Sequence, residues 1–140
     1  MKKFLGILVL GLIINSNAFS KDYSGKKLFC LYKGSLDKLK YNKYSAVEFI
    51  SNELATIYYI STGESSRWKI NQMDYKYLVK PARITFGKFN TVYINRESLE
   101  FRFHGPSQKC EIKSNDWNIY ESLEAILKKI ILEQESKNQF

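Results

Sequence analysis

The feature that most constrains the fold of this chain is a repeated alternation of apolar and polar side chains with a period of two. Segment 99–104 alternates large apolar residues with charged or polar ones, and similar stretches occur at 47–49, 75–80 and 83–87. Successive side chains of a β-strand point to opposite faces, so this pattern predicts strands with one buried and one solvated face. The chain is therefore predicted to be mainly β.

Short turn-forming clusters separate these stretches, among them Pro81, the polar run Asn95–Ser98 and the pair Gly105-Pro106. Connections this short allow only antiparallel neighbours, and a meander of many strands removes its exposed edges by closing on itself. We predict an antiparallel meander that closes into a small barrel or a strongly curved sheet. Its eight or nine strands are expected at 27–33, 45–50, 54–60, 67–72, 74–79, 83–88, 91–95, 99–104 and 109–113.

Two of these strands are apolar on both faces. The segments 28–32 and 54–60 do not alternate, and each carries apolar or aromatic side chains at nearly every position. A strand that is apolar on both faces is buried on both faces. Another element must therefore pack over the outside of the sheet.

The segment 114–140 is predicted to be a helix with a frayed end that belongs to the same domain as the β region 21–113. It lacks Gly and Pro after Asp116, and either Asn115 or Asp116 can cap its start. Its apolar side chains form one amphipathic arc, which comprises Ile119, Tyr120, Leu123, Ile126, Leu127, Ile130 and Ile131. This arc can cover the chain's own sheet, or it can contact a partner or a membrane surface.

The first twenty residues have the pattern of a secretory signal peptide. Lys2 and Lys3 precede an apolar run from Phe4 to Ile14, and Ala18–Ser20 has the small-x-small spacing that signal peptidase cleaves. Cleavage is expected before Lys21. The alternative is an uncleaved anchor, but a membrane-spanning helix needs about 20 apolar residues, more than this run contains.

The composition is typical of an AT-rich bacterial genome, because Phe, Tyr, Ile, Asn and Lys are abundant whereas Gly, Ala, Arg and Pro are scarce. The mature protein is therefore predicted to be periplasmic or secreted, with no transmembrane segment. Its two cysteines, Cys30 and Cys110, are expected to form a disulfide in that oxidising compartment. The rival interpretation is a reactive thiol with His104 as its base.

A net charge of +8 raises the question of an anionic partner. Lysines alternate with tyrosines in the segment 33–44, and we single out a candidate basic patch of Lys33, Lys38, Lys40 and Lys43. Nucleic acid is an unlikely partner for an exported protein, so an anionic component of the envelope is the sharper hypothesis. The alternative is a solvated loop whose charge serves solubility.

The polar loop 61–68 is the second candidate surface. It ends in an arginine next to a tryptophan, a pairing that is common at binding hot spots. Its candidate contact residues are Ser61, Gly63, Ser66, Arg67 and Trp68. The alternative is an ordinary hairpin loop in which Trp68 turns into the core.

No sequence motif indicates catalysis. The chain contains no nucleotide-binding loop, no nucleophile elbow, no metalloprotease signature and only one histidine. We therefore predict a non-catalytic protein with no metal and no cofactor.

Three segments carry a resemblance to known proteins: Ser24–Cys30, Ile94–Phe101 and Cys110–Ile112. With these segments the chain resembles small uncharacterised exported bacterial β-barrel proteins. In layout it is also similar to the periplasmic C-type lysozyme inhibitors, which are small β-barrels with a loop that enters the lysozyme cleft. That similarity implies that the loop from Ser61 to Trp68 is the inhibitory loop, although the C-terminal helix is additional here.

The function expected from these observations is non-catalytic binding in the bacterial envelope, either of a small apolar ligand or of a partner on the surface. Two alternatives stay open. One is inhibition of a cell-wall lytic enzyme through the loop 61–68, and the other is a structural or stress-related role in the envelope. A cavity large enough for a ligand would favour ligand binding, and a solid core with an ordered, projecting loop 61–68 would favour inhibition of a cell-wall enzyme.

Overall fold

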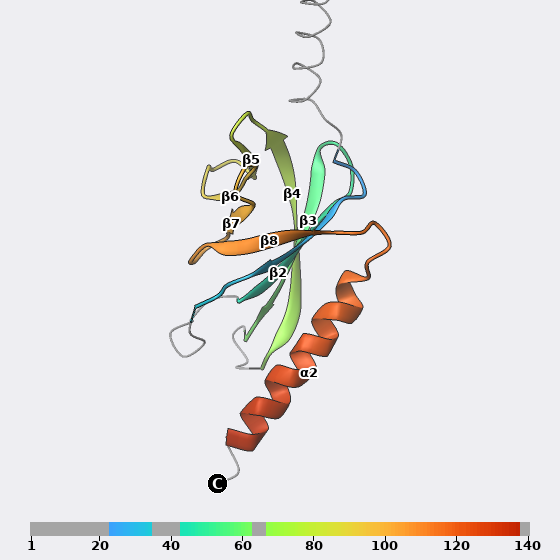
Figure 1. Ribbon diagram of the computed structural model, residues 1–140, viewed down its shortest axis with the longest axis vertical. Coiled ribbons are helices and arrows are strands. Elements are labelled where there is room, and N and C mark those ends of the chain that lie inside the picture. Colours follow the sequence, from blue (N-terminus) through green and yellow to red (C-terminus); the bar gives the residue numbers. More distant parts are fainter. Residues whose placement is uncertain (1–22, 35–42, 63–66, 138–140) are drawn as a thin grey trace, which may run out of the picture.

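A computed structural model describes residues 23–34, 43–62 and 67–137, and it confirms a mainly β fold with one C-terminal helix (Figure 1). The strands pair antiparallel in chain order, and the last strand pairs with the first to close a barrel. The strands are β1 (Lys27–Leu31), β2 (Tyr44–Phe49), β3 (Leu54–Ser61), β4 (Lys69–Val79), β5 (Arg83–Phe86), β6 (Val92–Asn95), β7 (Glu100–Arg102) and β8 (Gln108–Lys113).

The strand count is eight because the segments 67–72 and 74–79, predicted as two strands, form the single long strand β4. The predicted break lies at Met73, next to Asp74, whose residue type is disfavoured in strands. In the barrel its carboxylate accepts a hydrogen bond of 2.6 Å from the hydroxyl of Thr56, its register partner on β3. This cross-strand contact lets the polar side chain continue the strand.

The barrel interior is filled with side chains. Alternate residues of each strand point inward, as the period-two pattern predicts, and the rings of Phe49, Phe86 and Phe101 are among the largest fully buried groups. The ring centroids of Phe49 and Phe86 lie 6.2 Å apart, as do those of Phe86 and Phe101. Eight strands leave an interior just wide enough for such filling, so the middle of the barrel is a solid core.

The predicted disulfide is confirmed, and it lies at the seam that closes the barrel. Cys30 on β1 and Cys110 on β8 are direct register partners, with a Cα–Cα distance of 3.9 Å. Both side chains are buried in the core. The bond therefore joins covalently the two strands whose pairing turns the sheet into a barrel.

The helix α2 (Ile119–Lys137) packs along the outside of the barrel (Figure 1). Its buried residues Ile119 and Leu123 meet Ala46 of β2 and Ile60 of β3 in a second apolar cluster, with Phe29 of β1 at its edge. The helix thus covers strands that the sequence marked as apolar on both faces. We call this contact the helix–barrel cluster.

Two members of the expected apolar arc of α2, Tyr120 and Ile131, are only partly covered, and the ring of Tyr120 meets that of Tyr58 with centroids 6.3 Å apart. The cap also differs: the side chain of Asn118 accepts a 3.0 Å hydrogen bond from the backbone N–H of Glu121, in place of Asn115 or Asp116. The start of the helix is anchored by Lys27, whose Nζ donates to the carbonyl of Trp117 over 2.8 Å.

Candidate binding site

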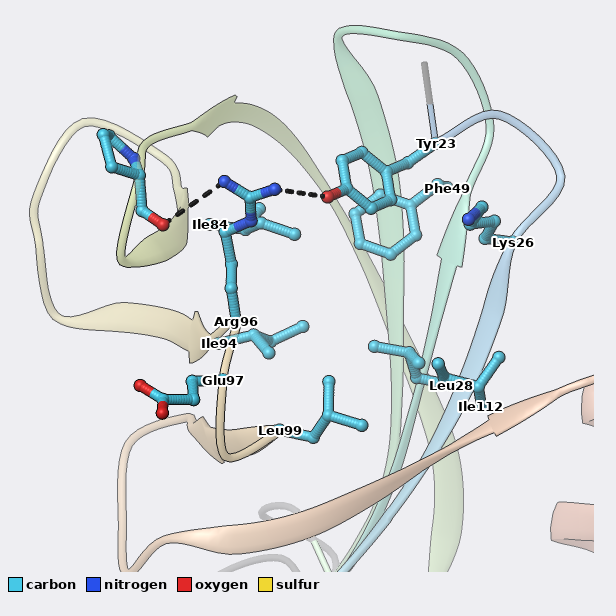
Figure 2. A pocket seen from close by; sticks show the side chains of 11 residues that line it. Tyr23, Lys26, Leu28, Phe49, Ile84, Ile94, Arg96, Glu97, Leu99 and Ile112 are labelled. Carbon is cyan, nitrogen blue, oxygen red and sulfur yellow. Dashed lines mark hydrogen bonds between the residues drawn. The ribbon is translucent and has the colours of Figure 1, made fainter. Parts of the chain in front are cut away.

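A cavity of about 560 Å³ opens at the end of the barrel where residues 23–26 meet the β4–β5 and β6–β7 turns (Figure 2). We call this end the barrel mouth. Its floor is apolar and consists of Leu28, Phe49, Ile84, Ile94, Leu99 and Ile112. Its rim is formed by Tyr23, Lys26, Pro81, Arg96 and Glu97. A few polar groups around an apolar hollow of this size are typical of a small-molecule site.

Ile112 is the most accessible apolar side chain of the floor. It pairs in register with Leu28 and shares the inward face of β8 with Cys110, so it points toward the interior. Nevertheless 67% of Ile112 is exposed, whereas Leu28 is buried. A bound apolar group would remove this surface from water, which is favourable in proportion to the area buried.

The β6–β7 turn that carries Arg96 is fixed by the side chain of Asn95, the last residue of β6. Its Oδ1 accepts hydrogen bonds of 3.0 Å from the backbone N–H groups of both Glu97 and Ser98. Such capping by an Asn side chain stabilises a tight turn. The turn places Arg96 at the mouth, whereas the carboxylate of Glu97 points away from it (Figure 2).

The guanidinium of Arg96 is held above the floor by three acceptors. Nη1 donates to the carbonyls of Lys80 and Pro81, at 3.0 and 3.3 Å, and Nη2 donates to the Tyr23 hydroxyl at 3.3 Å. These contacts connect the β4–β5 turn with the segment before β1. A permanently charged group therefore has a fixed position on the rim.

Lys26 supplies a second positive charge to the rim. The turn before it depends on Gly25, whose φ of 82° is a left-handed conformation that favours glycine. Backbone hydrogen bonds from Gly25 to Phe49 (2.7 Å) and from Phe49 to Lys26 (3.0 Å) attach this turn to the end of β2. The Lys26 ammonium lies 5.3 Å from the centre of the Tyr23 ring, a cation–π contact.

Groups with shifted pKa values lie away from the mouth. Burial raises the pKa of Tyr58 to about 12, and the nearby Glu48 carboxylate adds to this shift. Tyr58 and Asp116 line a smaller pocket of about 260 Å³ beside the start of α2. There a hydrogen bond from the Ser114 hydroxyl lowers the pKa of Asp116. Within the described residues, no three His, Cys, Asp or Glu side chains are placed to hold a metal ion.

The described residues of the predicted binding loop, 61–62 and 67–68, lie at the end of the barrel opposite the mouth. Ser61 ends β3, and its hydroxyl accepts a 2.8 Å hydrogen bond from the Asn71 side chain. Arg67 is exposed, whereas Trp68 is half-buried and packs against the helix–barrel cluster. Gly63 and Ser66 lie outside the described residues.

The two described lysines of the candidate basic patch, Lys33 and Lys43, are also separate from the mouth. Lys33 is exposed after β1, and Lys43 precedes β2 with its ammonium 5.6 Å from the Tyr44 ring. Lys38 and Lys40 lie outside the described residues, as does the expected signal peptide at 1–20.

The mouth was not predicted from the sequence. Arg96 was considered only as a turn residue, and Tyr23 and Lys26 precede the first strand. One signal was available, because the alternation in 109–113 puts Ile112 on the same face as Cys110. That pattern marks Ile112 as inward-pointing, but it does not show that the barrel end beside it is open.

No helix in the described part of the chain is both long enough and apolar enough to cross a membrane. Comparisons of the chain with protein-family models, with curated proteins and with solved structures find no match.

Proposed function

We propose that this protein is an exported, non-catalytic binding protein of the bacterial envelope that takes a small, largely apolar ligand into the barrel mouth. The observation that carries the proposal is the open apolar floor, and above all the inward-pointing but 67% exposed Ile112. The Cys30–Cys110 disulfide supports an oxidising compartment, and the signal-like segment 1–20 supports export. The solid core below the floor limits the ligand to the mouth.

Substitution at Ile112 tests the proposal with a neutral apolar probe, N-phenyl-1-naphthylamine, whose fluorescence increases in apolar surroundings. Ile112→Ser should weaken probe binding about tenfold, because one large aliphatic contact contributes roughly 1.5 kcal/mol or more. The fold should be unaffected, because most of the Ile112 side chain already contacts solvent.

The matched control is Leu78→Ser. Leu78 is 65% exposed, like Ile112, but it lies on β4 and is not part of the mouth. This variant should bind the probe like the wild type. Equal binding by the wild type and both variants would mean that the mouth is not the ligand site.

The two other functions predicted from the sequence stay open as alternatives. Inhibition of a cell-wall lytic enzyme would require the loop 61–68 to project into a cleft. Of its described residues, Arg67 is exposed but Trp68 is engaged with the helix–barrel cluster. A structural or stress-related role has no specific observation in its favour, so we place both alternatives below ligand binding.

A further inference from the structure

We infer that the barrel mouth selects single-chain amphiphiles with an anionic head, an inference that rests on the proposed function and specifies its ligand. Figure 2 shows the charged ends of Arg96 and Lys26 on either side of the Tyr23 ring, above the apolar floor. A ligand that fills the floor therefore brings its outer end against these groups.

Three side chains of the rim, those of Tyr23, Lys26 and Arg96, can donate hydrogen bonds. The ammonium of Lys26 and the guanidinium of Arg96 have no acceptor atoms. The Tyr23 hydroxyl already accepts a hydrogen bond from Arg96, and it keeps its own O–H for donation. A head that only accepts hydrogen bonds, such as an ionised carboxylate, complements the ammonium of Lys26 and the hydroxyl of Tyr23 at once.

The positive charge around the mouth also favours an anionic head group. In the described part of the chain, the ammonium of Lys26 contacts the Tyr23 ring and has no carboxylate within ion-pair distance. Glu97 is exposed and its carboxylate points away from the floor (Figure 2). Hydrogen bonds between charged groups are stronger than neutral ones, so an anionic head gains more here than an alcohol.

The apolar floor determines the tail of the ligand. Six of the eleven residues that line the hollow of about 560 Å³ form its apolar floor, and its polar side chains lie on the rim. This volume is within the range of sites for small molecules and suits one hydrocarbon chain. The solid core below it, which begins at Phe49 and Ile84, prevents deeper insertion.

Isothermal titration calorimetry of the full mature protein with three ten-carbon ligands tests the inference at pH 7.5. Decanoate should bind at least about tenfold more tightly than decanol. A hydrogen bond to a charged group strengthens binding by a factor of about ten or more. Decyltrimethylammonium should bind no better than decanol. Added salt should weaken the binding of decanoate but not that of decanol.

Two lysine variants locate the effect. Lys26→Gln should reduce the preference for decanoate over decanol. Lys69→Gln removes an exposed lysine from the opposite end of the barrel, at the start of β4, and should bind all three ligands like the wild type.

The outcomes separate this inference from the proposed function. Equal binding of decanoate and decanol, or an unchanged preference in Lys26→Gln, would overturn the selection of an anionic head and leave apolar binding standing. A failure of all three ligands to bind, together with a failure to bind the naphthylamine probe, would overturn both.

Discussion

Two residues with left-handed backbone conformations delimit the shortest strand of the barrel. Leu99 has a φ of 57° and His104 a φ of 49°, and β7 contains only the three residues Glu100–Arg102 between them. The alternation in 99–104 correctly predicts that Phe101 and Phe103 are buried. It could not predict the two backbone reversals, because side-chain hydrophobicity does not report φ.

Substitution at His104 should reveal the backbone strain at this position. A left-handed conformation costs an ordinary residue roughly 1–2 kcal/mol and costs glycine almost nothing. His104→Gly should therefore keep or raise the free energy of unfolding, by up to about 1 kcal/mol. His104→Val should lower it by about 1 kcal/mol or more, because β-branched residues rarely adopt positive φ. Urea denaturation measures both changes.

Arg102→Val is the control for this comparison, because Arg102 is exposed and has the extended conformation of β7. Valine is favoured in strands, so the free energy of unfolding should change by less than about 0.5 kcal/mol. If valine at 102 and at 104 have the same effect, the conformation of His104 carries no measurable strain.

At the scale of elements, α2 and the outer face of the sheet bury each other's apolar side chains. The sequence indicates this packing. The apolar arc of α2 and the strands 28–32 and 54–60, which are apolar on both faces, would each expose apolar side chains to water if nothing covered them. The exact rotation of the helix was not predictable. It depends on the shape of the outer face of the barrel, where Ala46 leaves room for the larger side chains Ile119 and Leu123.

A pair of leucines on α2 tests the docking of the helix. Leu123 is fully buried in the helix–barrel cluster, whereas Leu132 is 64% exposed on the same helix. Leu123→Asp should lower the free energy of unfolding by at least about 3 kcal/mol, because it removes a core side chain and buries a charge. Leu132→Asp should lower it by less than about 1 kcal/mol.

Thermal melts of the two variants decide between the possible roles of the helix. A large difference between them supports a helix docked on its own barrel. If Leu123→Asp melts like Leu132→Asp, the apolar face is instead available to a partner or a membrane surface.

At the scale of the whole molecule, the disulfide connects positions that are 80 residues apart. Among the described strands, it lies at the only pairing that is not between consecutive strands. Both its existence and its role in closing the sheet follow from the sequence, given an oxidising compartment. The barrel mouth does not follow from the sequence, because it is assembled from turns that precede or connect strands far apart in the chain. The turns at Pro81 and at Asn95–Ser98 are recognisable in the sequence, but their arrangement around one cavity depends on the closure of the barrel.

Removal of the disulfide should strongly destabilise the barrel. The double variant Cys30→Ala/Cys110→Ala should lose about 2–5 kcal/mol of unfolding free energy, because a cross-link over a long loop restricts the unfolded chain. Both cysteines are buried, so alanine also leaves small cavities. Urea denaturation measures the loss, and the wild type under strong reduction should unfold at a similar midpoint. An unchanged midpoint in the double variant would show that strand pairing alone holds the seam.

The closure of the barrel between β1 and β8 also sets an order of events for a newly made chain. Each later strand can pair with its predecessor as soon as it emerges, so β1 gains β2 early, but the other edge of β1 must wait for β8. Until then the hydrogen-bonding edge of β1 is open, and such edges are templates for aggregation. The outer faces of β1 to β3 wait longer still, since α2 follows β8. The open edge of β1 is therefore protected only by β8, and the outer faces of β1 to β3 are covered only by α2, after the first seven strands have emerged.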